Sequence, residues 1–156
     1  LKLICLHIGI PNLAGLIFLI YCDGRGVIGA YVDNKTMGEL KMTIKRIDSG
    51  EMLSQATIHN DVAYVCGQTA TDRSANMKAQ TAEVLVKIDD RLAKCGTDKT
   101  KLLMVTIYLS DMSQKSAMNK AWSEWMGDLP RPARACVGTP LGTADTLVEI
   151  VANAAI

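Results

Sequence analysis

From residue 42 onward, apolar residues recur at two different spacings, which predicts a domain that mixes strands and helices. Short runs that alternate between apolar and polar residues, or that are rich in β-branched residues, are typical of strands. Such runs lie at residues 42–48, 55–69 (two strands), 101–109, 134–138 and 146–154. His59, Asn60 and Asp61 favour a hairpin turn within residues 55–69. Residues 101–109 are so largely apolar that we expect burial of that strand on both faces, or nearly so.

Two further segments carry apolar residues three and four positions apart, as amphipathic helices do. The first spans residues 74–95 and is followed by Gly96, a residue favoured just beyond the end of a helix. The second is expected to begin at a cap formed by Asp111 or Ser113. The apolar stripes consist of Met77, Val84, Leu85, Ile88 and Leu92 in the first helix and of Met118, Ala121, Trp122 and Trp125 in the second.

The predicted order of elements is therefore β-β-β-α-β-α-β-β, which is an α+β fold with a sheet of about six strands. Two helices cannot cover both faces of such a sheet, so we expect both helices on one face. The other face then needs a partner, and face-on assembly of identical chains would bury it.

The first 41 residues have a different character. Residues 3–22 contain no Asp, Glu, Lys or Arg, although Pro11 and Asn12 interrupt the apolar run, and residues 23–41 are more polar. Three interpretations remain open: sequence from upstream of a start at Met42, a membrane anchor or signal, or an added folded element. We accordingly treat residues 1–41 as an extra apolar segment of uncertain origin and residues 42–156 as the main domain.

Composition narrows the class of protein. The chain of 156 residues is 49% hydrophobic and 21% charged, as expected of one folded domain, and its formal net charge is +1. Residues 1–41 hold four of the 17 basic and three of the 16 acidic side chains, so 13 of each remain in the main domain. Such a neutral domain lacks the basic footprint that nucleic acids require.

The cysteines indicate the compartment. Five cysteines are dispersed along the chain, and the only histidines are His7 and His59, so neither a zinc site nor a disulfide framework is indicated. A reducing compartment is the simpler interpretation, and we expect a cytoplasmic protein.

Arg134 and Glu149 are the two charges placed most unusually, because each lies in a predicted strand of small and apolar residues. Pro132 favours an extended chain around Arg134. One interpretation is an ion pair between neighbouring strands, or two exposed edge residues. The other is a carboxylate-binding arginine and an acid that positions water. The strand register decides between them.

Three other residues allow both a structural and a functional interpretation. Cys136 lies on the same face of its strand as Arg134 and is either a packing residue or, less simply, a reactive thiol. Gly67 permits close approach of a ligand to the backbone, but an ordinary bend explains it equally well. Asn119 is a polar residue on a largely apolar helix and is either solvated or a ligand contact.

The motifs of the main domain resemble, in order, those of the RidA family of reactive-intermediate (enamine/imine) deaminases, and look closest to its short bacterial branch. The resemblance runs from about Thr43 to the C-terminus. It is carried by "CGQT", "QTAEVLVKIDDRLAKCG", "VTIYLSDM", "MNKAWSEW", "RPARACV" and "LVEIVANAA". Residues 1–41 contain none of these motifs.

The resemblance implies a chorismate-mutase-like fold, a homotrimer with sites in the clefts between subunits, and hydrolysis of 2-imino acids to 2-oxo acids and ammonia. It implies that Arg134 binds the substrate carboxylate and that Glu149 serves the attacking water. Substrate contacts are implied for Gly67, Cys136 and Asn119, with no metal or cofactor. Leu53 stands where many members carry a tyrosine, so a non-catalytic metabolite-binding trimer that uses the same cleft is the alternative.

Overall fold

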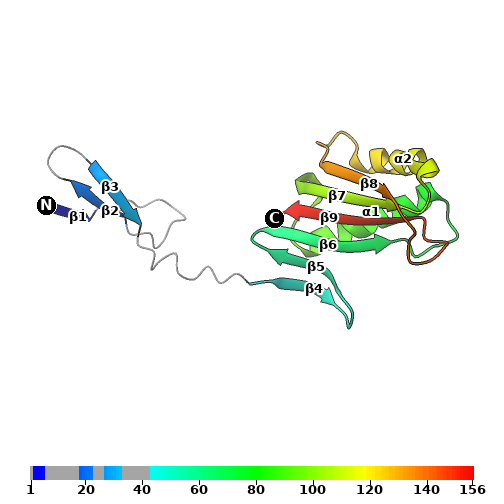
Figure 1. The fold of residues 1–156 in the computed structure, drawn as a ribbon, viewed down its shortest axis with the longest axis horizontal. Helices are drawn as coiled ribbons and strands as arrows, with labels where there is room; N and C mark the ends of the chain where they lie inside the picture. Colours follow the sequence, from blue (N-terminus) through cyan, green and yellow to red (C-terminus); the bar gives the residue numbers. More distant parts are fainter. Residues whose placement is uncertain (1, 6–17, 23–26, 33–42) are drawn as a thin grey trace. The chain divides into compact units, whose positions relative to one another are not determined.

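The computed structural model describes residues 2–5, 18–22, 27–32 and 43–156, and the chain divides into two compact units, Leu1–Met42 and Thr43–Ile156 (Figure 1). In the first unit, β1 (Lys2–Cys5), β2 (Phe18–Cys22) and β3 (Val27–Val32) form an antiparallel sheet in that order. The middle of the apolar run, residues 6–17, lies outside the described residues. Among the described residues, the structure contains no helix of the length and apolar character needed to span a membrane.

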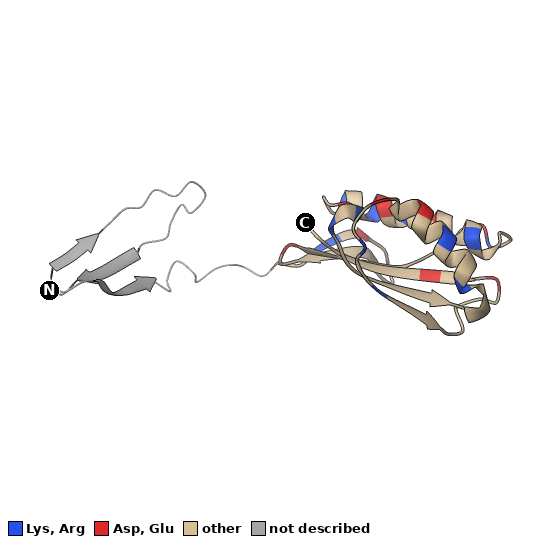
Figure 2. Cartoon of the chain, turned by 90° about the horizontal axis from the view of Figure 1, so that it is seen from above, with Lys and Arg blue, Asp and Glu red and all other residues tan. Residues whose placement is uncertain are grey.

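The second unit confirms the predicted α+β order. Its elements are β4 (Lys45–Ser49), β5 (Ser54–His59), β6 (Val62–Thr69), α1 (Met77–Lys94), β7 (Leu102–Leu109), α2 (Lys115–Met126), β8 (Ala133–Gly138) and β9 (Val148–Ala155). The strands form one sheet in the order β4-β5-β6-β9-β7-β8. Only the β7–β8 pair at one edge is parallel, and the other pairs are antiparallel. Both helices lie on the same face of this sheet (Figures 1 and 2).

Local sequence explains where these elements begin and end. Asn76 caps α1 by accepting a hydrogen bond from the backbone N–H of Ala79 at 3.0 Å, and Gly96 follows α1 with a φ of 81°. The predicted hairpin turn is confirmed, because Asn60 and Asp61 both adopt positive φ values between β5 and β6.

The second helix begins later than its cap residues suggested. The carboxylate of Asp111 accepts a hydrogen bond from the backbone N–H of Ser113 at 2.9 Å, which caps a single 3-10 turn, Met112–Gln114. The α-helix itself starts at Lys115, and Gln114 at its N-cap makes no capping bond with its side chain. Neither Asp111 nor Ser113 therefore caps α2 directly.

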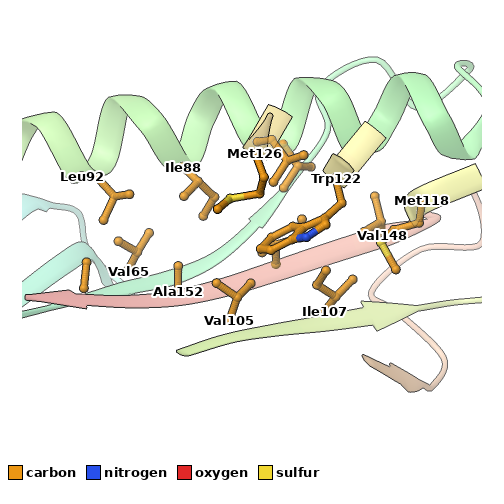
Figure 3. Packing of buried hydrophobic residues seen from close by; sticks show 14 of the residues in the cluster. Val65, Ile88, Leu92, Val105, Ile107, Met118, Trp122, Met126, Val148 and Ala152 are labelled. Atoms are coloured by element: carbon orange, nitrogen blue, oxygen red, sulfur yellow. The ribbon is translucent and has the colours of Figure 1, made fainter. Parts of the chain in front are cut away.

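The expectation that β7 is buried on both faces, or nearly so, holds fully for one face only. Val105, Ile107 and Leu109 are fully buried beneath the helices. Thr106 and Tyr108, which alternate with them on the opposite face, are only half-buried. Only one face of the sheet carries helices, so the other face of β7 has no layer to cover it. The core consists of sheet residues and helix residues that interdigitate on the helix side (Figure 3), including Val65, Val105, Ile107, Val148, Ala152, Ile88, Leu92, Met118, Trp122 and Met126.

Candidate functional site

Arg134 lies on β8, the edge strand that the sequence prediction placed after Pro132. Its register partner on β7 is Val105, a buried residue of the core, so the Arg134 side chain leaves the sheet on the helix side. There its guanidinium lies over the ring of Trp122, 5.0 Å from the ring centroid. Such a cation–π contact is worth about 0.5–1 kcal/mol at an exposed site. Among the described residues, Arg134 has no carboxylate partner, so its guanidinium remains available to bind an anion.

A pocket of about 390 Å³ opens beside this guanidinium. It is lined by Asn119, Trp122, Ser123, Arg131, Pro132 and Arg134. The side-chain oxygen of Asn119 is buried and has no hydrogen-bond partner among the residues that the structure describes. A buried acceptor left unsatisfied costs about 1–3 kcal/mol, which makes Asn119 an unusual residue at the edge of this pocket. Within the described residues, the pocket therefore presents a cation without a counter-ion beside Asn119, and we call it the arginine half-site.

Glu149 points away from this pocket. Val148 and Ile150, its neighbours on β9, are both buried under the helices, so the Glu149 side chain extends from the opposite, helix-free face. Its register partners are Thr69 on β6 and Tyr108 on β7. The side chain is only partly buried.

Gly67 makes room for the Glu149 carboxylate. A β-carbon added at Gly67 would lie only 1.8 Å from Oε1 of Glu149. The register of β6 against β9 shifts between Val65 and Gln68, which is a bulge that contains Gly67. The glycine thus allows a carboxylate to lie directly against the strand, and we call Gly67 and Glu149 the glutamate half-site.

A group of polar side chains beside Gly67 was missed by the sequence analysis. The amide nitrogen of Gln68 donates hydrogen bonds to the Gln55 side-chain oxygen at 3.1 Å and to the Cys66 sulfur at 3.0 Å. Burial raises the pKa of the Cys66 thiol, so this thiol stays protonated at neutral pH. The spacing of Gln55 and Gln68 in the sequence gives no sign of this contact, which depends on the pairing of β5 with β6.

The remaining predicted residues lie close to these half-sites. Cys136 is two residues beyond Arg134 on β8, on the same side of the strand, and packs half-buried against the core. Leu53 is 52% exposed in the connection from β4 to β5, where it lines an open hollow with Arg91 and Gln55. The hollow therefore has an aliphatic wall at the position where the family resemblance placed an aromatic ring.

The two half-sites lie on opposite faces of one sheet. The sequence-based alternative of an ion pair between Arg134 and Glu149 on neighbouring strands is wrong, because β7 separates β8 from β9. The structure joins Arg134 with Asn119 on one face and Gly67 with Glu149 on the other. One copy of the chain cannot present both charges to a single small molecule.

Comparison with known proteins agrees with this fold. The family model described as Endoribonuclease L-PSP matches residues 43–156. A RutC family protein of Haemophilus ducreyi is 43% identical over 113 residues, which cover 72% of this chain and 97% of that protein. The RutC family protein YoaB of Escherichia coli is 38% identical over 115 residues, covering 74% of this chain and all of YoaB.

Solved structures give the same result. A crystal structure of a YjgF family member from Neisseria meningitidis superposes with a TM-score of 0.70 at 35% identity, covering 73% of this chain and 95% of that one. The domain is thus of the chorismate-mutase-like α+β class that the sequence indicated. The chain belongs to the RidA (RutC/YjgF) family.

Proposed function

We propose that the protein is a hydrolytic deaminase of reactive 2-imino and enamine acids, such as those derived from 2-aminoacrylate, which it converts to 2-oxo acids and ammonia. The observation that carries this proposal is the Arg134 guanidinium, which is held over Trp122 without a carboxylate partner in the described part of the chain. A planar guanidinium binds a carboxylate through two parallel hydrogen bonds. Every 2-imino acid carries such a carboxylate next to its reactive carbon.

The proposed site combines two copies of the chain. Because Arg134 and Glu149 leave opposite faces of the sheet, the glutamate half-site of one copy has to meet the arginine half-site of another. The helix-free face is suited to such an assembly, since Tyr64 and Val137 on it are each 44% exposed. The homotrimer with sites between subunits that the resemblance implies would bring the half-sites together.

The chemistry needs little beyond placement. Water attacks the electrophilic C2 of the imine, a C–O bond forms, and the electrons of the C=N bond move to nitrogen. Glu149 would accept a proton from that water and deliver it to the nitrogen, which gives a carbinolamine. It would then move the hydroxyl proton to the amino nitrogen, so that the C–N bond breaks and ammonia leaves as the carbonyl forms. Arg134 would fix the carboxylate so that C2 faces the water, and the reaction consumes only imine and water.

The name endoribonuclease, which the family model carries, receives no support from the charges of this domain. Residues 42–156 keep 13 of the 17 basic and 13 of the 16 acidic side chains, and Figure 2 shows both signs interspersed along the helices. RNA binding relies on phosphate contacts by clustered cations and weakens with salt. RNA binding that survives moderate salt would contradict this argument.

A coupled assay tests the deaminase proposal. A pyridoxal-phosphate dehydratase releases 2-aminoacrylate from serine, and semicarbazide traps the imine that escapes hydrolysis. Added protein should speed the release of pyruvate and ammonia and lower the yield of semicarbazone, whereas the Arg134→Ala variant should not. Lack of acceleration by the wild-type protein would contradict the enzyme proposal. If the wild-type protein bound 2-oxo acids without speeding hydrolysis, the non-catalytic binding alternative would replace the enzyme proposal.

A further inference from the structure

The arginine half-site contains a second guanidinium, that of Arg131, which the proposed reaction does not use. Arg131 lines the same pocket as Arg134, on the segment between α2 and β8. In the described part of the chain its guanidinium forms one hydrogen bond, to the backbone carbonyl of Leu129 at 3.2 Å. The pocket is lined by no Asp or Glu among the described residues. Two positive charges therefore share one small pocket without an internal counter-ion.

This arrangement favours a ligand with two negative charges. Like charges at a shared site repel one another, and only part of that repulsion is screened by water and salt. Within one copy of the chain, a monocarboxylate bound to Arg134 would leave the charge of Arg131 without a partner, and Glu149 of another copy is engaged with the attacking water in the proposed reaction. A dicarboxylate of matching length would pair with both guanidinium groups.

We propose that the preferred substrates are dicarboxylic 2-imino acids, the imines of aspartate-like and glutamate-like amino acids. Arg134 binds the carboxylate next to C2, and Arg131 binds the distal carboxylate. This inference rests on the proposed deaminase function, and the hydrolysis is the same, giving a dicarboxylic 2-oxo acid and ammonia. A pocket of about 390 Å³ has room for such a four- or five-carbon acid. The reaction that supplies this substrate is then the oxidation of an acidic amino acid to its imine.

An assay in which flavin amino-acid oxidases generate the imines in the reaction mixture tests the proposal. The wild-type protein should have a kcat/KM for the imines of aspartate or glutamate about tenfold or more above that for the imine of alanine. Arg131→Gln should lower kcat/KM for the dicarboxylic imines far more than for the imine of alanine, which has no distal group, and so remove most of this preference. Arg131→Lys should retain part of the preference, since the charge remains.

A matched control removes the same charge elsewhere. Arg46 on β4 is exposed and lies outside the pocket, so Arg46→Gln should change neither kcat/KM. If Arg46→Gln and Arg131→Gln had equal effects, overall charge rather than Arg131 would explain the preference, and the proposal would be overturned. Equal loss on both substrates in Arg131→Gln would overturn it as well.

Binding provides a readout that does not depend on turnover. In calorimetric titrations, succinate and 2-oxoglutarate should bind the wild-type protein about tenfold or more tightly than propanoate and pyruvate, and Arg131→Gln should abolish the difference. Equal affinities in the wild-type protein would overturn this inference even if imines were hydrolysed. Selective dicarboxylate binding without any imine hydrolysis would instead refute the proposed function and leave the ligand class of the pocket standing.

Discussion

At the scale of single residues, Arg134 decides the function. Replacing Arg134 with Ala should abolish imine hydrolysis while the domain stays folded, because within the described residues the side chain makes only its contact with Trp122. Arg134→Lys should also be poor, since an ammonium group cannot form the paired hydrogen bonds, and the loss should be about 2–5 kcal/mol of transition-state binding. Thermal midpoint, oligomeric mass and rate are measured on one preparation. A folded Arg134→Ala protein with wild-type activity would refute the role in binding the carboxylate.

Gly67 provides an independent test of the glutamate half-site. The added β-carbon in Gly67→Ala would collide with the end of the Glu149 side chain, which can rotate away, so we expect at least about a tenfold fall in kcat with a thermal midpoint changed by only a few degrees. Gly50→Ala is the control, because its β-carbon would approach only the Leu53 carbonyl oxygen, at 3.7 Å. Unchanged kcat in Gly67→Ala would show that the position of Glu149 does not matter.

The sequence singled out these residues as candidates but did not predict their contacts. Arg134 could be recognised as an unusual charge because Pro132 and the alternating pattern around it indicated an extended strand. The contact of Gly67 with Glu149 could not be predicted, since it depends on the pairing of β6 with β9 and on a bulge. Arg131 was not singled out, because an arginine beside a proline in a connecting segment is ordinary until a pocket is seen.

At the scale of elements, hydrogen bonds of Glu83 connect α1 to the segment that follows β6. Its carboxylate accepts hydrogen bonds from the backbone N–H groups of Thr71 at 2.7 Å and Asp72 at 3.2 Å, and pairs with Lys87 at 3.1 Å. The Thr71 bond above all lowers the pKa of Glu83 from 4.5 to about 2. The folded state therefore favours the ionised carboxylate.

This shift predicts a pH-dependent contribution to stability. A carboxylate whose pKa is lower in the folded state stabilises fully above its unfolded pKa of 4.5 and loses that effect as the pH falls toward 2. Glu83→Gln should lower the stability at pH 7 by about 1 kcal/mol, a modest effect because the group is partly exposed to solvent. The difference from wild type in urea unfolding should shrink between pH 4.5 and pH 2. A difference that is constant across this range would contradict the assignment.

Element types and their order followed from sequence patterns, whereas strand neighbours did not. The spacing of apolar residues predicted the helix that is α1. Asn60 and Asp61 predicted the turn between β5 and β6. The insertion of β9 between β6 and β7 is not encoded in any local pattern, because alternation defines the face of a residue but not the strand beside it. This neighbour order is what separates Arg134 from Glu149.

At the scale of the whole molecule, we expect the second unit to assemble by itself. A protein that starts at Met42 should fold and form a homotrimer, because the helix-free sheet face of this unit is exposed in a single copy and the family resemblance implies subunits there. Light scattering should give three times the mass of one chain. A monomer at micromolar concentration, or a truncated protein that does not fold, would contradict the expectation.

The central claim is that Arg134 of one copy acts with Glu149 of another, and subunit complementation tests it most directly. Arg134→Ala and Glu149→Gln should each be inactive when purified alone. The two variants are mixed in equal amounts, unfolded and refolded, so that they form mixed trimers. About a quarter of the interfaces then carry both native residues, and about a quarter of the wild-type imine hydrolysis should return. Mixed trimers, verified by differently tagged subunits, that show no recovered activity would contradict the claim.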